Sequence, residues 1–332
     1  MAPADAIRAL TPLQGQHAPA PFLALAARLD DFARADLEAA LSAGAVVKTT
    51  VMRLTLHLAA ADDYPAYHQL ARQARMRTWR KTYAHLDEEA VTASLRGWFS
   101  APRGNAEIRE RVGAYDGVAD DPWTPVIFAR TLLPLVQLPP AGHWDDRGRG
   151  AAFVVDPRPE PSPADAAELV LRRYLAAFGP ASARDAAAWA GVAQRDFAEA
   201  LARIETVTYR DEEGRELLDL PGAPLPPPST RLPVRLLAHW DQPLLAYADR
   251  DRIIPPELRP LKLTLSGDPT VTVDGRVAAS WSMTEENGTV TVAVTPHTDI
   301  PRAARAEIRA EAERIARFAH PKAKPHLRGL SL

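Results

Sequence analysis

The spacing of apolar residues along this 332-residue chain changes in a recurring order, from the helical period to the two-residue alternation of strands. The clearest copy occupies residues 161–220. LVLRRYLAAFG has helical spacing, Ser182 is a helix N-cap candidate, and Phe197, Leu201 and Ile204 share one face of a third helix. TVTYRDEEGRELLDL then alternates around Glu-Glu-Gly, which predicts a β-hairpin. Three short helices followed by a hairpin are typical of a winged helix.

Two less regular copies of this pattern precede it. In residues 1–85, FLALAARL and DFARADLEAAL predict helices, and AVVKTT and RLTLHLA predict strands. In residues 86–160, EEAVTASLRGWF and AEIRERVG predict helices, which are followed by two strands and a long polar loop between them. The sequence therefore predicts winged-helix modules over 1–85, 86–160 and 161–220. The polar loop of the second module contains His143, Trp144, Arg147 and Arg149.

A change of composition after residue 220 predicts a domain boundary. Residues 221–233 are rich in proline, which excludes a helix and favours an extended connector. Residues 234–332 are expected to form a β-rich part, because VRLLAHW, KLTLSG, TVTVDGRVAASWSM and GTVTVAVTP alternate with period two. Asp274-Gly275 and Asn287-Gly288 predict hairpin turns, and AARAEIRAEAERIARFA predicts a closing helix. The predicted fold class is α+β.

Composition excludes several classes of function. The chain has no cysteine, so disulfides, thiolate nucleophiles and cysteine-ligated metals are excluded. It lacks HExxH, GxGxxG, GxxxxGK[ST] and GxSxG motifs and a long apolar segment, and its first residues, MAPADAIRAL, do not show the pattern expected of a secretory leader. A formal net charge of −2 gives no overall indication of a nucleic-acid partner. We therefore expect a cytoplasmic chain with no metal, no cofactor and no membrane partner.

Two glutamines near the N-terminus, Gln14 and Gln16, are the first candidates for chemistry. A carboxamide offers both an acceptor and a donor, so two of them can hold a water molecule, although neither is a strong base. They would suit a reaction whose leaving group departs readily. The residues alone equally fit two solvated or capping glutamines. The carboxylates of Asp62, Asp63 and the HWDQ run are also available, with capping or surface roles expected.

Basic and polar residues supply a candidate binding surface. In KTTVMRLTLHLA, Arg53, Thr55 and His57 are expected on one strand face, opposite leucines, and an ordinary solvated face is the alternative. ARQARMRTWRKTY concentrates arginines that could neutralise phosphates or form a solvated helix face. HPKAKPHLRGL is a basic tail, flexible if nothing binds it.

Four segments together resemble a known family. LQGQ followed by LAARL, then VVKTTVMRLTLHLAAADDY, LLAHWDQPLLAYADRDRIIPPE and VTVDGRVAASW are similar to the winged-helix DNA glycosylases that include AlkZ and YcaQ. The resemblance implies tandem winged helices that form a C-shaped cleft for duplex DNA, with a β-rich C-terminal part. It places the family's catalytic Gln–aliphatic–Gln motif at Gln14 and Gln16. Here Gly15 stands where an aliphatic side chain is usual.

The resemblance also implies an activity. It indicates a monofunctional DNA glycosylase that excises bulky N7-alkylguanine adducts, with interstrand crosslinks as a further substrate, in repair or in self-resistance to an alkylating natural product. The expected partner is double-stranded DNA with alkylated purines, bound by a monomeric bacterial protein at the nucleoid, without an obligate protein partner. The alternative is a non-catalytic winged-helix protein, either a regulator or a damage-binding or drug-binding protein. The expected DNA-binding residues are Lys48, Arg53, Thr55, His57, Arg75, Arg77, Arg80, Lys81, Lys322 and Lys324.

Overall fold

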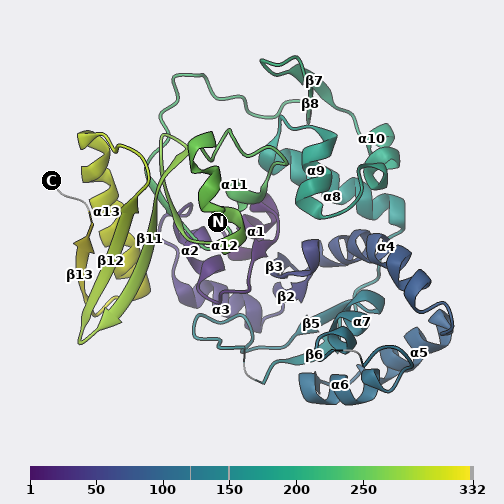
Figure 1. The fold of residues 1–332 in the computed structure, drawn as a ribbon. Coiled ribbons are helices and arrows are strands. Elements are labelled where there is room, and N and C mark those ends of the chain that lie inside the picture. The colour runs from purple at the N-terminus through teal and green to yellow at the C-terminus, as the bar shows by residue number, and fades with distance from the viewer. Residues whose placement is uncertain (120, 149, 330–332) are drawn as a thin grey trace. The chain divides into compact units, whose positions relative to one another are not determined.

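The computed structural model describes residues 1–119, 121–148 and 150–329, so Arg149 of the predicted polar loop lies outside the described residues. The chain folds into two compact units of mixed helix and sheet (Figure 1). Unit 1 contains residues 1–18 and 37–223, and unit 2 contains residues 19–36 and 224–332. None of the described helices is long and apolar enough to cross a membrane.

Unit 1 is built on a six-stranded sheet in which all neighbouring strands are antiparallel. Its central strand, Val46–Thr50, is buried along its whole length. Four of its five residues are Val or Thr, whose β-branched side chains favour the strand conformation. Gln14 is on an edge strand, so the glutamine motif lies at the edge of the sheet. In spatial order the strands are β1 (Leu13–Gln14), β3 (Leu56–Ala60), β2 (Val46–Thr50), β5 (Leu135–Gln137), β6 (Ala152–Val155) and β4 (Arg103–Gly104).

Helices of unit 1 pack around a core of aromatic and aliphatic side chains. Trp79, Leu95, Phe99 and Phe128 are buried together in this core. Trp79 and Phe128 have ring centroids 5.4 Å apart. The helices that contribute to this core are α4 (Tyr64–Thr82), α5 (Glu88–Trp98), α6 (Asn105–Gly113) and α7 (Thr124–Leu132). Two further helices, α1 (Pro3–Leu10) and α3 (Arg34–Ser42), precede them in the chain.

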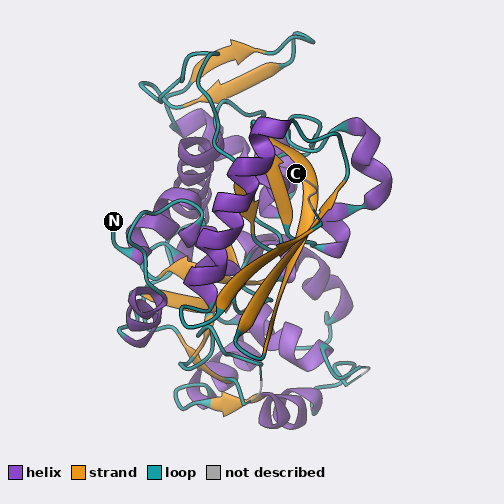
Figure 2. Ribbon diagram, turned by 90° about the vertical axis from the view of Figure 1, so that its left-hand side faces the viewer, coloured by secondary structure: helices purple, strands orange, loops and turns teal. Residues whose placement is uncertain are grey.

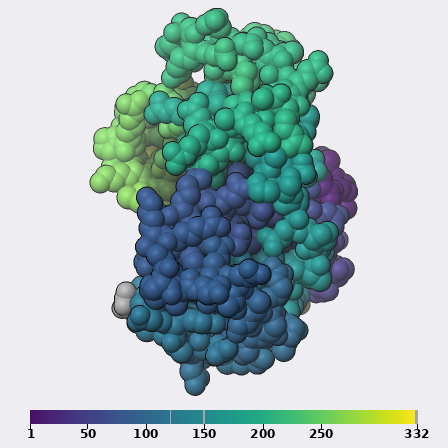
Figure 3. Space-filling model, turned by 90° about the vertical axis from the view of Figure 1, so that its right-hand side faces the viewer, coloured from purple at the N-terminus to yellow at the C-terminus, as the bar shows by residue number. Residues whose placement is uncertain are grey.

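The element order predicted for residues 161–220 is confirmed. Ser162 and Ser182 cap the first two helices. Trp189 is fully buried, and its ring centroid lies 5.1 Å from that of Tyr174. The elements are α8 (Pro163–Phe178), α9 (Ala183–Ala190), the 3-10 turn η2 (Gln194–Phe197), α10 (Ala198–Arg203), β7 (Val207–Arg210) and β8 (Glu216–Asp219). Figure 3 shows a face of unit 1 on which α4 to α6, in blue, lie below these elements, in teal and green.

Unit 2 contains a five-stranded sheet with α13 (Arg302–Ala319) along it (Figure 2). Both hairpin turns are as predicted, because Asp274-Gly275 and Asn287-Gly288 adopt the consecutive positive φ values of type I′ turns. The strands in spatial order are β13 (Lys324–Arg328), β12 (Thr289–Pro296), β11 (Arg276–Glu286), β10 (Thr270–Val273) and β9 (Arg235–Leu237). Short helices α11 (Gln242–Leu245), η3 (Pro256–Leu261) and α12 (Leu263–Ser266) lie between β9 and β10.

Three features differ from the sequence-based expectation. The run KLTLSG forms the single helical turn α12 instead of a strand, because left-handed residues at Lys262 and Gly267 bound it. Residues 324–328 of the basic tail form strand β13, which pairs in parallel with β12. The segment 19–36, with helix α2 (Ala20–Ala26), joins unit 2, where Arg314 donates to Ala26 O at 2.7 Å, although the sequence places it in a contiguous first module.

Candidate active site

The two candidate catalytic glutamines bind each other. The backbone N–H of Gln16 donates to Gln14 Oε1 at 2.9 Å, and Gln14 Nε2 donates to Gln16 Oε1 at 3.1 Å. The first bond requires an oxygen acceptor, so it fixes which end of the Gln14 amide is oxygen. Gln14 is buried and Gln16 is exposed. The pair is therefore preorganised, with the Gln16 carboxamide as the part open to a substrate.

Gly15, between the two glutamines, lies against the backbone of the neighbouring strand. Its N–H donates to Leu56 O at 2.8 Å. A Cβ added to Gly15 would lie 3.4 Å from His57 C and 3.5 Å from His57 Cα, which is ordinary van der Waals contact. The backbone thus leaves room for a first side-chain carbon at the position where the resembling family has an aliphatic residue.

We expect Gly15→Ala to preserve the fold and the activity of this site. Alanine loses less conformational entropy than glycine on folding, so the variant should gain about 0.4–1 kcal/mol in free energy of unfolding. Urea denaturation of the two proteins, with base-release rates measured in parallel, checks both parts. A loss of stability above about 1 kcal/mol would show that the contact with His57 is too tight for a methyl group.

His57 faces Gln14 across the β1–β3 ladder. The two residues are register partners, and because Gly15 N bonds Leu56 O, theirs is the pair without mutual backbone hydrogen bonds, whose side chains lie closest. His57 Nδ1 donates to Thr55 O at 2.9 Å, so Nε2 of the neutral ring carries no proton. Nε2 is buried, without a hydrogen-bond partner among the described residues.

The charge state of His57 follows from its surroundings. Burial, followed by the positive charges of Arg53 and Arg75, lowers the pKa of His57 to about 3, although the bond to Thr55 O opposes the shift. The imidazole is therefore neutral at physiological pH. It can accept a hydrogen bond beside Gln14, but it is a poor base.

We expect this histidine to make the protein acid-sensitive. The folded-state pKa of His57 is depressed below the ordinary 6.5, so the unfolded chain binds the proton more readily and stability falls as pH drops from 6.5 towards 3. The contribution between pH 7 and pH 5 is about 2 kcal/mol. Urea denaturation at these two pH values should show a correspondingly smaller loss for His57→Gln than for the wild type. The exposed His85→Gln is the control, and equal losses in wild type and His57→Gln would contradict the assignment.

The turn that joins β2 to β3 differs from the sequence prediction. The prediction that Arg53, Thr55 and His57 share one strand face is wrong. Arg53 lies in the 3-10 turn η1 (Met52–Leu54) with left-handed backbone angles, and His57 is fully buried. Thr55 turns its hydroxyl back to Met52 O at 3.1 Å. A two-residue period could not predict this, because the strand stops at Thr50 and resumes at Leu56.

Three arginines make hydrogen bonds at or next to this turn. Arg53 Nη1 donates to Trp189 O, Arg75 Nη2 donates to Val51 O, and Arg130 Nη1 donates to the Thr50 hydroxyl at 3.2 Å. Within the described ranges, no carboxylate lies within ion-pair distance of Arg75 or Arg130, and burial lowers the pKa of each to about 10. Both stay charged at neutral pH. Their positive charge is therefore not neutralised by a contact within the described chain.

The sequence did not identify Arg130 as a candidate residue. It is a single basic residue at the end of the apolar helix TPVIFARTL, where nothing local distinguishes it from a solvated arginine. In the folded protein its guanidinium lies 4.6 Å from the ring centroid of Phe153. A lone charge in a largely apolar helix is the only signal that the sequence offers.

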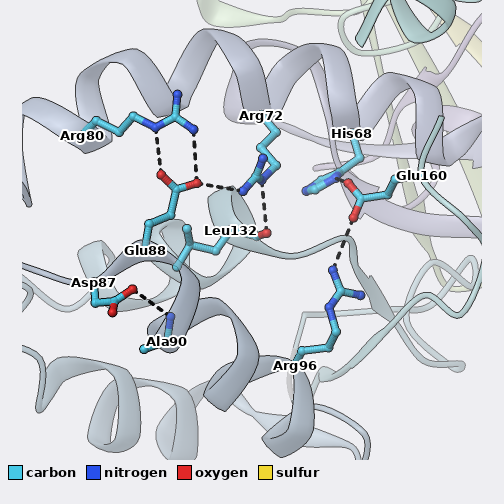
Figure 4. Close-up of polar contacts among 9 residues, drawn as sticks. All are labelled: His68, Arg72, Arg80, Asp87, Glu88, Ala90, Arg96, Leu132 and Glu160. Atoms are coloured by element: carbon cyan, nitrogen blue, oxygen red, sulfur yellow. Dashed lines mark hydrogen bonds and ion pairs between the residues drawn. The ribbon is translucent and has the colours of Figure 1, made fainter. Parts of the chain in front are cut away.

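Other arginines of α4 are already paired. Arg77 makes two bonds to Asp196, at 2.8 and 2.7 Å, and Arg80 makes two to Glu88, at 2.8 and 3.2 Å. Arg72 also reaches Glu88 (Figure 4). The pKa of Glu88 is lowered, chiefly by its bond to Arg80. These side chains hold helices together, whereas Lys81, next to them, is exposed.

The predicted lysines lie elsewhere. Lys48 is only 5% exposed and bonds Asp146 at 2.6 Å. Lys48 pairs with Leu58, and Thr49 pairs with His57, so Lys48 is on the opposite face of the sheet from Gln14. Lys322 and Lys324 are exposed on unit 2. The structure thus brings Gln14, Gln16 and His57 together, and it places Lys48 on the other face of their sheet.

The remaining candidate carboxylates have structural partners. Asp63 bonds Arg173 at 2.8 and 3.2 Å. Asp241 of the HWDQ run bonds Arg28 at 2.6 and 3.2 Å, and its side chain is fully buried. Among the residues that the structure describes, no group of three or more His, Asp or Glu side chains could hold a metal ion.

Comparison with known proteins identifies the family. The model of the family described as DNA glycosylase AlkZ-like matches residues 7–318. A relative from Streptomyces sahachiroi, named an interstrand DNA cross-link repair glycosylase, is 26% identical over 307 residues, which cover 82% of this chain and 78% of the relative. The solved structure of Streptomyces sahachiroi DNA glycosylase AlkZ has the same fold, with a TM-score of 0.79 at 21% identity over 99% of this chain and 93% of that one. Because the family model spans nearly the whole chain, this protein belongs to the AlkZ-like DNA glycosylase family.

Proposed function

We propose that this protein is a monofunctional DNA glycosylase that excises bulky N7-alkylguanine from duplex DNA and also unhooks interstrand crosslinks. The observation that carries the proposal is the mutually bonded pair of Gln14 and Gln16 at the edge of the sheet, in a chain of this family. The relative's name supports the extension to crosslinks. The activity would serve repair or self-resistance to an alkylating natural product, in a monomer that acts on nucleoid DNA in the bacterial cytoplasm.

The proposed chemistry suits carboxamides. An N7-alkylguanine is positively charged, so the bond between C1′ and N9 is already weakened and the base leaves neutral without an acid. The oxygen of water forms the new bond to C1′ as the C1′–N9 bond breaks, one proton of that water is released to solvent, and the deoxyribose keeps the hydroxyl as an abasic site. Gln14 and Gln16 would position that water, and their oxygens would stabilise positive charge at C1′. No lysine is present in the motif, so no Schiff base is expected.

We further propose that the segments 1–85, 86–160 and 161–220 are tandem winged helices, and that they form a C-shaped cleft for the duplex. The confirmed order of three helices and a hairpin in the last segment supports this assignment. An open cleft would admit a bulky lesion that a closed base-flipping pocket would exclude.

The proposed DNA contacts are limited by the ion pairs of the fold. Arg53, Thr55 and Arg75 lie at the turn beside the glutamines, and Lys81 is exposed on α4, so these remain candidates. Arg77 and Arg80 already bind Asp196 and Glu88, so any DNA contact that they make is shared with these carboxylates. We do not retain Lys48, because it is buried in an ion pair. Lys322 and Lys324 remain candidates as exposed lysines of unit 2.

The proposal is tested with purified protein and duplex DNA that carries one defined N7-alkylguanine. Release of the modified base, together with strand breaks only after alkaline treatment, would establish a monofunctional glycosylase. Breaks without alkali would indicate a lyase step. Absence of release from small, bulky and crosslinked lesions, combined with tight binding to one undamaged sequence, would identify a regulator instead.

A further inference from the structure

The turn of residues 51–55 has an unusual backbone. Arg53 and Leu54 follow one another with positive φ values of 52° and 59°. Residues other than glycine, asparagine and aspartate rarely adopt this left-handed backbone region. Leucine has no polar side-chain group that could form a compensating local hydrogen bond. Strain of this kind persists where surrounding contacts impose it, and it concentrates at functional sites.

Several independent contacts impose the conformation of this turn. Thr55 N donates to Met52 O at 3.1 Å, and Arg75 donates to Val51 O. Gly191 lies directly against Arg53, since a Cβ there would be 2.8 Å from Arg53 Cγ and 3.0 Å from its backbone nitrogen. The turn is therefore held in place before any ligand binds.

The clamped turn presents one apolar side chain to solvent. Val51 and Met52 are buried, whereas Leu54 is 46% exposed. The β1–β3 register pairs Gln14 with His57, and Gly15 N bonds Leu56 O next to that pair. Gln16 directly follows Gly15, and Leu54 precedes Leu56 by two residues, so the exposed glutamine and the exposed leucine leave the same end of the ladder.

The charges around the turn identify its occupant. The guanidinium groups of Arg75 and Arg130 bind at Val51 and Thr50, and no carboxylate within the described ranges neutralises either of them. These two arginines are largely buried, so they give the turn a positive charge from beneath, whereas Leu54 is exposed. A polyanion with apolar faces suits both features, and DNA is such a ligand, with phosphates outside and bases inside.

We propose that Leu54 is an apolar wedge that enters the base stack beside the modified nucleotide. This inference rests on the proposed function, because it assumes that Gln14 and Gln16 act on duplex DNA. Inserted Leu, Phe or Ile side chains unstack neighbouring base pairs and kink the duplex. Such local unstacking opens a path for the glutamines to the anomeric carbon without complete flipping of a bulky base. A wedge that is rigid before binding loses little entropy when it inserts.

The test uses substitutions that fit the left-handed backbone. Leu54→Asn and Leu54→Gly both favour positive φ and remove the apolar side chain, and Leu54→Met keeps an apolar one. Leu265→Asn is the control, because Leu265 is an exposed leucine of unit 2. We expect the Asn and Gly variants to melt at or above the wild-type temperature, yet to excise N7-alkylguanine from duplex at least tenfold more slowly. The same lesion in single-stranded DNA, and the Met and Leu265 variants on duplex, should change less than threefold.

A second measurement does not depend on catalysis. A duplex with a tetrahydrofuran abasic analogue and 2-aminopurine at the neighbouring position reports unstacking by a rise in fluorescence. We expect that rise with wild type and Leu54→Met but not with Leu54→Asn or Leu54→Gly.

The two proposals fail in different ways. Full duplex excision by Leu54→Asn, or no fluorescence rise with the wild type, would overturn the wedge and leave the glycosylase intact. A fluorescence rise that depends on Leu54, without base release by wild type from either duplex or single strand, would overturn the proposed glycosylase and support the wedge. Equal slowing on single and double strands would also overturn the wedge, because a single strand has no duplex stack to open.

Discussion

Replacing either Gln14 or Gln16 with alanine should lower the rate of base release by about 100-fold to 1000-fold, the usual effect of removing one preorganised polar group from a transition state. The Gln14 carboxamide accepts from the backbone N–H of Gln16 at 2.9 Å and donates to the Gln16 carboxamide at 3.1 Å, so the two side chains position each other. We therefore expect the double variant to be little slower than the slower single variant, since groups that act as a unit are not additive. Single-turnover rates on duplex N7-alkylguanine measure this.

Binding and folding must be separated from chemistry in that experiment. The affinity for an uncleavable duplex should change by less than threefold in each glutamine variant, because the proposed role lies in the transition state. Gln194→Ala is a matched control, since Gln194 is an exposed glutamine of unit 1 outside the site. Full activity in the double variant would refute the glutamine mechanism, and a parallel loss of affinity would assign the glutamines to DNA binding.

The largest effect on stability should come from Asp241, in the HWDQ run of unit 2. Its carboxylate is completely buried and binds Arg28 at 2.6 and 3.2 Å. Asp241→Ala would leave the Arg28 guanidinium without its partner, at a cost of about 3–5 kcal/mol. Urea denaturation of wild type and variant measures this loss directly.

Two comparisons show whether the ion pair is the cause. Arg28→Met/Asp241→Leu removes both charges, and it should be distinctly more stable than Asp241→Ala, because no buried charge remains unpaired. Asp251→Ala removes a surface carboxylate that binds Arg259, and it should cost less than about 1 kcal/mol. A loss of similar small size for Asp241→Ala would contradict a structural role for this carboxylate.

Local signals in the sequence determined much of the fold. Ser162 and Ser182 bond their own helix N-termini three residues onward, so their caps need no distant partner. Asp274-Gly275 and Asn287-Gly288 adopt turn conformations set by the residues themselves. The glutamine motif is equally local, because its two bonds join residues two positions apart. Features of this kind can be predicted from the sequence, because their stability depends on residues that are close together in the chain.

Only the tertiary structure decided which charged and polar residues are available for function. Lys48 and Asp146 are far apart in the sequence, and so are Arg77 and Asp196, yet each pair forms an ion pair in the fold. His57 is neutral because burial removes the water that would solvate its charge. The availability of a charge and the pKa of a buried ring depend on contacts between distant segments, which hydrophobic periodicity does not encode.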